Sequence, residues 1–367
     1  MIIHRAERGE CCGDIARKYG VCEDILRMNN NIFGTEPAEG EELLVLTPTR
    51  SYVAERGDTI ERLALRFGVL RRELLANNPI IEREGLRPGQ RLALKYGDKI
   101  YGQAATNGYY FGGSCRILRE RLPHFTYVTV GAAVFECGRI RETFDGREAV
   151  GILRMADKIP LLRIFCKDAD IASVDDGELI AEQMLSAAIN GGYKGIVLGG
   201  EPVSDSLLLK LRRHSFGCDL ILFSEVGPKS GEHLCDSTDG TVFSGLSPVF
   251  RPADYISELK DFAAKRENNR CMPELCPFAE NNGRYIPIEE ALSVARRGGC
   301  KIEHDESAGA CRFTHSHTGE YVFPSLENIK ATLDTVHEYG YMGISFDVAR
   351  TPQSHLMMYG ALFGKRG

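Results

Sequence analysis

The sequence predicts an α/β protein in which a (β/α)8 barrel follows two small α+β modules. Two observations lead to this prediction. Residues 1–95 contain an internal repeat with an offset of 48 residues, and in residues 98–367 short apolar runs alternate with amphipathic stretches. A chain of 367 residues is also too long for one small core, so two or more domains are expected.

The repeat is built from turn signals at matching positions. Gly9-Glu10 and the helical stretch 15–21 return as Gly57-Asp58 and the stretch 63–69. The segment 26–32, with three asparagines, returns as 74–80. Each copy is predicted to form a strand, a glycine–acid turn, two helices separated by a glycine, an asparagine-rich loop and a second strand. Such a repeat indicates a small unit that folds on one plan twice.

This pattern resembles the LysM module, a family that binds N-acetylglucosamine polymers such as peptidoglycan and chitin. The second copy, residues 50–95, is close to the family pattern. The first, residues 1–47, has Cys11 where the second has Thr59, and Asn31 where the second has Pro79. We therefore expect the second module to bind better. The resemblance implies a set of glycan-binding residues: Gly57, Asp58, Thr59, Asn78 and Pro79 in the second module, and Gly9, Glu10 and Asn30 in the first.

Composition and charge exclude several classes of function. The net charge of −6 argues against binding to nucleic acid, which needs a basic face. The chain has no run of about 18 apolar residues, so we expect no membrane span. The start of the chain lacks a basic segment followed by an apolar one, which predicts synthesis in the cytoplasm without a signal peptide. The twelve cysteines have no Cys-x-x-Cys spacing, and we interpret most of them as buried free thiols.

The barrel prediction follows from apolar runs that alternate with helical patterns. The runs are 127–135, 160–165, 195–198, 219–223, 241–243, 270–275 and 343–346. Continuous apolar strands between amphipathic helices are typical of a parallel sheet covered on its outer face. Seven or eight such units favour a closed barrel over an open sheet. The glycine-rich stretch 102–113 is expected to be a loop. Residues 284–323 break the rhythm and predict an inserted α+β subdomain.

Residues 98–367 resemble family-18 glycoside hydrolases, in the group that carries N-terminal LysM modules and acts on spore cortex peptidoglycan. The segments that support this are 288–292 and 304–307 in the insertion, and 325–331 and 339–345 near the end of the chain. The resemblance implies an N-acetylglucosaminidase or chitinase-like barrel without a cofactor, in the spore coat, spore cortex or cell envelope.

The catalytic motif of that family is poorly matched. The family has Asp-Gly-x-x-x-Asp-x-Glu on the fourth barrel strand, and this chain has Lys194 and Gly199 at the two aspartate positions. Glu201 keeps the place of the glutamate that protonates the leaving oxygen. The missing aspartate would orient the acetamide of the sugar and stabilise its positive oxazolinium, and losing such a group lowers rates roughly 10²–10³-fold. We therefore predict weak or absent hydrolysis.

A rebuilt site is the alternative that the strand ends suggest. Several acidic residues fall at the carboxyl ends of predicted strands, where barrel active sites lie, and Phe346 could stack on a sugar there. These residues are Glu136, Glu201, Glu225, Glu274 and Asp347. The plainer interpretation is that strand ends are polar because they meet solvent. A metal held by these acids is not expected, because the ligand spacing is absent.

Three hypotheses about function remain open. The first is a peptidoglycan-binding protein with a degraded barrel, and the second is an active N-acetylglucosaminidase that uses Glu201 as its acid. The third is a spore-coat scaffold whose barrel binds protein partners. The sequence does not decide between them, nor whether the cysteines are buried or cross-linked.

Overall fold

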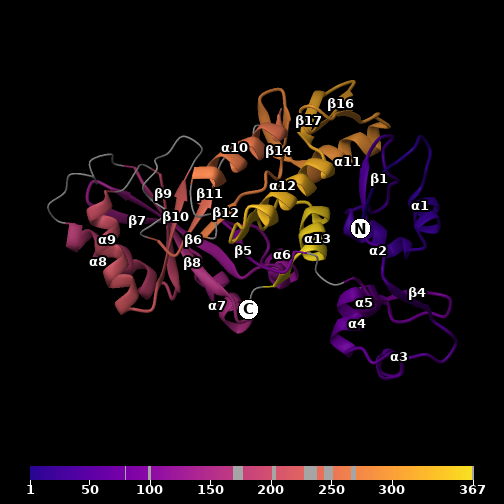
Figure 1. Ribbon diagram of the computed structural model, residues 1–367, viewed down its shortest axis with the longest axis horizontal. Helices are drawn as coiled ribbons and strands as arrows, with labels where there is room; N and C mark the ends of the chain where they lie inside the picture. The colour runs from indigo at the N-terminus through magenta and orange to yellow at the C-terminus, as the bar shows by residue number, and fades with distance from the viewer. Residues whose placement is uncertain are drawn as a thin grey trace.

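The computed structural model describes residues 1–78, 80–97, 101–167, 177–200, 204–226, 238–243, 251–265 and 270–365. Figure 1 shows a barrel on the left, an α+β subdomain at the top, and two small modules on the right. We call residues 1–47 module 1 and residues 50–95 module 2. None of the helices in the described part of the chain combines the length and apolar character needed to cross a membrane.

The barrel consists of eight parallel strands, which confirms the predicted fold class. Going round the sheet, the order is β12, β11, β10, β9, β8, β6, β5 and β18. A parallel bridge between Glu274 and Ser345 closes the circle. The strands are β5 (Gln103–Tyr109), β6 (Tyr127–Glu136), β8 (Ile159–Cys166), β9 (Gly195–Gly200), β10 (Ile221–Val226), β11 (Gly240–Phe243), β12 (Cys271–Pro273) and β18 (Gly343–Asp347). Two further strands join the sheet, β7 (Arg139–Phe144) beside β6 and β19 (Gly364–Lys365) beside β5.

The first barrel strand, β5, lies in the stretch that the sequence analysis expected to be a loop, so that expectation was wrong. Its glycine content is misleading because Gly108 serves close packing rather than a turn. A Cβ atom at Gly108 would lie 2.6 Å from Cγ2 of Val348 and 3.0 Å from Cδ1 of Phe125. A glycine inside a strand often marks such a close approach.

Amphipathic helices cover the outside of the barrel. Their buried residues, such as Met184, Leu208 and Leu333, belong to one continuous core that also contains the outward-facing strand residues. Ser204 and Ser325 cap two of these helices by accepting backbone amide hydrogens. The helices are α6 (Cys115–Arg121), α7 (Arg147–Met155), α8 (Gly177–Asn190), α9 (Asp205–Gly217), α10 (Pro252–Lys265), α12 (Leu326–Glu338) and α13 (Gln353–Leu362), with a short 3-10 turn at Leu122–His124.

An α+β subdomain precedes the last barrel unit; we call it the insertion. Its five antiparallel strands run in the order β14, β13, β17, β16, β15, and helix α11 (Ile288–Gly298) packs on the sheet. The strands are β13 (Phe278–Asn281), β14 (Arg284–Pro287), β15 (Glu303–Asp305), β16 (Ala310–His315) and β17 (Gly319–Pro324). The sheet of the insertion therefore includes β13, which precedes residue 284, the expected first residue of the insertion.

The two modules repeat one plan, a two-stranded antiparallel sheet with helices packed on it. Gly20 and Gly68, 48 residues apart, both end the first helix in the left-handed conformation, with φ of 66° and 65°. Module 1 contains β1 (Ile2–Arg5), α1 (Cys12–Tyr19), α2 (Glu23–Asn29) and β2 (Glu42–Val45). Module 2 contains β3 (Arg50–Val53), α3 (Ile60–Phe67), α4 (Arg71–Asn77), α5 (Ile80–Glu84) and β4 (Arg91–Lys95).

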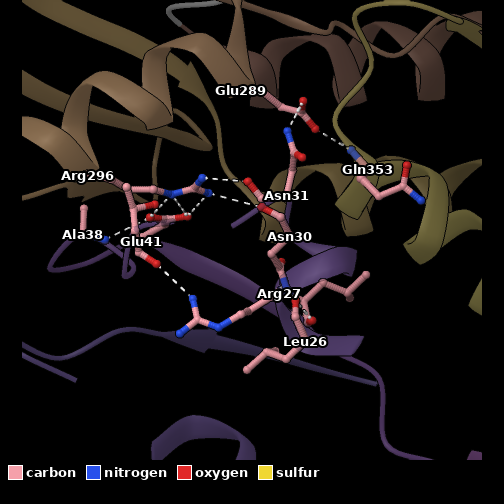
Figure 2. A network of polar contacts seen from close by, with 11 residues as sticks. Leu26, Arg27, Asn30, Asn31, Ala38, Glu41, Glu289, Arg296 and Gln353 are labelled. Atoms are coloured by element: carbon pink, nitrogen blue, oxygen red, sulfur yellow. Dashed lines mark hydrogen bonds and ion pairs between the residues drawn. The ribbon is translucent and has the colours of Figure 1, made fainter. Parts of the chain in front are cut away.

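Module 1 is joined to the insertion by a buried ion pair. The Arg296 guanidinium on α11 lies 2.6 Å from Oε1 of Glu41, and the two side chains are only 6% and 2% exposed. Arg296 also donates to the backbone oxygens of Asn30 and Asn31, while the Asn31 side chain donates to Glu289 at 2.6 Å (Figure 2). These contacts bring α11 against the asparagine-rich loop of module 1.

Apolar packing strengthens the same joint. Leu44 and Leu46 of module 1 belong to the barrel core, and Ala38 belongs to the core of the insertion. Module 2 has a core of its own, and Figure 1 shows it below module 1 and away from the barrel strands. Module 1 is therefore part of the main body of the protein, whereas module 2 projects from it.

Replacing Arg296 with alanine should destabilise the protein by about 3–5 kcal/mol, because it leaves the Glu41 carboxylate buried without its partner. The measurement is urea unfolding followed by circular dichroism. Arg297→Ala is the matched control, since Arg297 is an exposed neighbour that donates to its own helix at Ser293. Equal unfolding free energies for the two variants would contradict this account of the joint.

Candidate functional site

Module 2 carries an open groove between its glycine–acid turn and the residues around α5. The groove has a volume of about 580 Å³ and places Asp58, Thr59 and Glu61 opposite Gly85 and Leu86. Thr59 caps α3 by accepting the amide hydrogen of Arg62. The first turn of that helix is therefore held in place along one wall of the groove.

The acid of the turn has a structural task. The Asp58 carboxylate accepts the backbone amide of Glu55 at 2.8 Å and the hydroxyl of Tyr52 at 3.0 Å. The backbone hydrogen bond from Glu55 is the largest cause that lowers the pKa of Asp58.

In module 1, Glu10 accepts the Glu7 amide in the same way. Gly57 and Gly9 precede these acids with positive φ, at 91° and 77°. Each carboxylate thus fixes the shape of its turn.

The two matching asparagines, which the resemblance implies as glycan-binding residues, have their side chains inside their modules. Asn78 donates to the backbone oxygens of Leu74 and Ala93 and accepts from the Ala93 amide, and it is 1% exposed. Asn30 makes the equivalent three bonds to Leu26 and Leu44. Each side-chain amide bonds backbone groups of a helix and of a strand that would otherwise lack partners. The asparagine therefore recurs in both modules because the fold needs it. Pro79 lies outside the described residues.

The equivalent region of module 1 is closed by its own side chains. Glu36 accepts the backbone amide of Cys12 at 2.7 Å and pairs with Arg27, whose Nη1 also donates to the backbone oxygen of Thr35. Cys12 and Arg27 stand 48 residues before Ile60 and Leu75, both of which line the groove of module 2. The hydrogen bonds of Glu36 in module 1 therefore lie at the position that corresponds to the groove of module 2.

At the mouth of the barrel, an ion pair occupies the space beside Gly199. Arg163 on β8 and Glu225 on β10 form a bidentate ion pair, with N···O distances of 2.6 and 3.0 Å. A Cβ atom at Gly199 would lie 2.6 Å from Oε2 of Glu225 and 3.4 Å from Nη2 of Arg163. The missing motif aspartate would therefore have its side chain where this pair now lies.

A second carboxyl and a phenol lie close to the ion pair. Burial, and then the charges of Glu225 and Asp347, raise the pKa of Glu274 to about 8. The Tyr109 hydroxyl is buried and has no hydrogen-bond partner among the described residues. Burial also raises the pKa of Tyr109 well above its ordinary value. Near neutral pH Glu274 and Tyr109 therefore both keep their protons beside the ion pair of Arg163 and Glu225.

The other expected mouth residues are placed differently. Asp347 lies near Glu274, but its Oδ1 accepts the amides of Ala349 and Arg350 and its Oδ2 accepts the Arg350 guanidinium. Glu136 lies at the rim, 3.5 Å from the Lys167 ammonium. Glu201 lies outside the described residues, so nothing is said of its position.

Phe346 does not face the mouth, and the expectation that it stacks on a sugar was wrong. It is completely buried between barrel and helices, where its ring meets the rings of Phe125 and Tyr359. Side chains alternate along a strand, so Ser345 and Asp347 face the interior instead. Sequence reasoning also missed Arg163 and Tyr109. The signals in the sequence that could have found them were a cation inside an apolar strand, Arg163, and a tyrosine at the end of a strand, Tyr109.

Comparisons with known proteins agree with this architecture. Residues 52–95 match the LysM domain family. No curated protein matches the chain in sequence. The fold is similar to that of the spore cortex-lytic enzyme SleL from Bacillus cereus, with a TM-score of 0.76 and 17% identity over 100% of this chain and 99% of that one.

Two further solved structures extend this likeness. SleL from Bacillus megaterium gives a TM-score of 0.74 and 14% identity over 99% of this chain and 98% of that one. A chitinase from Chromobacterium violaceum gives 0.62 and 15%, covering 72% of this chain and all of the other. At these identities the likeness establishes the fold.

The contribution of Glu274 to the stability of the protein should fall as pH rises from about 5 to 8. The folded chain keeps this proton up to about pH 8, whereas the unfolded chain releases it near its ordinary pKa. More protons are thus bound by the folded state within this window, and raising the pH favours unfolding. Urea unfolding at pH 5 and pH 8 measures the effect. Glu274→Gln should lose less stability across this range than wild type, with Glu136→Gln as the control. An unchanged loss in Glu274→Gln would be the contradictory result.

Proposed function

We propose that this protein binds an N-acetylglucosamine-containing glycan, such as peptidoglycan, through module 2, and that its barrel is a weak or inactive hydrolase. The observation that carries the proposal is the contrast between the modules. Module 2 has an open groove at the turn of a LysM domain, whereas Glu36 crosses the matching place in module 1. Glycan recognition by this chain therefore depends on module 2.

The barrel mouth supports weak catalysis on electrostatic grounds. Substrate-assisted hydrolysis in family-18 enzymes passes through a positively charged oxazolinium, which needs a negative group beside it. Among the described residues, the carboxylate nearest Gly199 belongs to Glu225, and Arg163 neutralises it. A guanidinium next to a developing cation raises the free energy of that cation.

The rival function is an active N-acetylglucosaminidase with Glu201 as its acid. The observation in its favour is the fold, which is similar to the folds of two spore cortex-lytic enzymes and of a chitinase. The structures of the two spore cortex-lytic enzymes lead us to propose a spore or envelope location for this chain as well. At that location, spore-coat proteins are the protein partners that we propose.

Blocking the groove of module 2 should weaken binding to insoluble peptidoglycan or chitin by about tenfold or more. Thr59→Arg places a long cationic side chain in the groove, and Cys11→Arg makes the same change at the matching position of module 1. Sedimentation of each full-length variant with the polymer gives the affinity, and circular dichroism checks the fold. If Cys11→Arg weakened binding as much as Thr59→Arg, the assignment to module 2 would fail.

The wild-type barrel should release little or no sugar from N-acetylglucosamine oligomers or cortex fragments. Product release followed by mass spectrometry would detect turnover, which for ordinary enzymes is about 1–10³ per second. Turnover in that range that disappears in Glu201→Gln would establish the rival function instead.

A further inference from the structure

Three side chains that suit a metal ion meet at the joint between module 1 and the insertion. Glu42 begins β2 of module 1, and His304 and Cys311 lie directly opposite one another on β15 and β16. One donor atom from each residue lies within 4.8 Å of the other two. The glycan groove and the barrel mouth do not use these residues.

The distances fit the edges of a tetrahedral zinc site. His304 Nδ1 lies 3.3 Å from Oε1 of Glu42 and 3.4 Å from Sγ of Cys311. Zinc binds sulfur at about 2.3 Å and nitrogen or carboxylate oxygen at about 2.0–2.2 Å, so tetrahedral angles separate N from O by about 3.4 Å and N from S by about 3.6 Å. Small shifts of the side chains would complete the geometry.

The surrounding hydrogen bonds already orient the ligand atoms. His304 Nε2 lies 2.7 Å from the backbone oxygen of Gly40 and donates to it, which leaves Nδ1 facing the other two ligands. A metal-binding histidine almost always has such a partner on its other nitrogen. Oε2 of Glu42 accepts the Leu326 amide at 2.6 Å, so Oε1 is the oxygen that faces His304. Arg5 approaches Oε1 at 3.4 Å, and a carboxylate oxygen can accept two partners.

Burial and access also suit a structural ion. Glu42 and Cys311 are buried, and His304 is half-buried and lines a cavity of about 420 Å³ that Arg5 shares. Water from this cavity can supply the fourth ligand. A mixed set of one sulfur, one nitrogen and one oxygen favours zinc over calcium or magnesium, which prefer oxygen alone.

We propose that Glu42, His304 and Cys311 bind a Zn²⁺ ion that ties module 1 to the insertion. Binding would displace the thiol proton of Cys311 to solvent, as thiolate coordination requires. The site escaped sequence reasoning because its ligands come from two separate units and show none of the short cysteine spacings of zinc fingers. The ion would add a second fixed point to the joint that Arg296 and Glu41 already hold.

The test measures zinc bound by the full-length chain without a histidine tag. Protein equilibrated with zinc chloride and freed of excess metal should retain about one ion per chain by mass spectrometry of the elements. Cys311→Ser should remove that ion. Cys276→Ser, another buried cysteine, and His317→Gln, at the exposed β16–β17 turn, should retain it.

A second measurement uses wild type alone, in case Cys311→Ser does not fold. Zinc should raise its melting temperature and magnesium at the same concentration should not, because a ligand that binds only the folded state stabilises it. No retained zinc, equal zinc in Cys311→Ser and wild type, or loss of zinc in His317→Gln would overturn the proposal.

Discussion

The arrangement of this protein depends on the buried ion pair between Arg296 and Glu41. A guanidinium and a carboxylate that are almost fully shielded from water must stay paired, because separating them leaves a buried charge. The pair lies at the asparagine-rich loop of module 1 and is surrounded by hydrogen bonds to the backbone of that loop. It therefore fixes one of two related modules to the body of the protein, while the other keeps its groove open.

This division explains why module 1 has Asn31 where module 2 has Pro79. Asn31 adopts a positive φ of 50°, which proline cannot reach, and its side chain bonds Glu289 of the insertion. A Cβ atom at Gly40 would collide with the backbone oxygen of Ile302, so the loop approaches the insertion more closely than any larger residue allows. The departure of module 1 from the LysM pattern at Asn31 is thus a contact with the rest of the chain.

The sequence predicted the architecture well because repeats and apolar periodicity report directly on packing. It failed where the decisive information was local geometry. Phe346 was expected at the mouth because it stands at the carboxyl end of a predicted strand, but its ring packs against those of Phe125 and Tyr359. The resemblance names the asparagines of both modules as glycan-binding residues, and no sequence pattern shows that each side chain also bonds the backbone of a helix and of a strand. The pairing of Arg163 with Glu225 joins strands 62 residues apart, and no sequence spacing reveals it.

The central claim is that the two modules have different tasks, one of attachment within the chain and one of binding outside it. Hydrogen–deuterium exchange of the full-length protein, with and without an N-acetylglucosamine oligomer, tests this most directly. The account predicts slower exchange in residues 55–62 and 80–88 of module 2 when the oligomer is present. Residues 7–14 and 30–42 of module 1 should exchange at unchanged rates. Protection that appears in module 1, with module 2 unaffected, would contradict it.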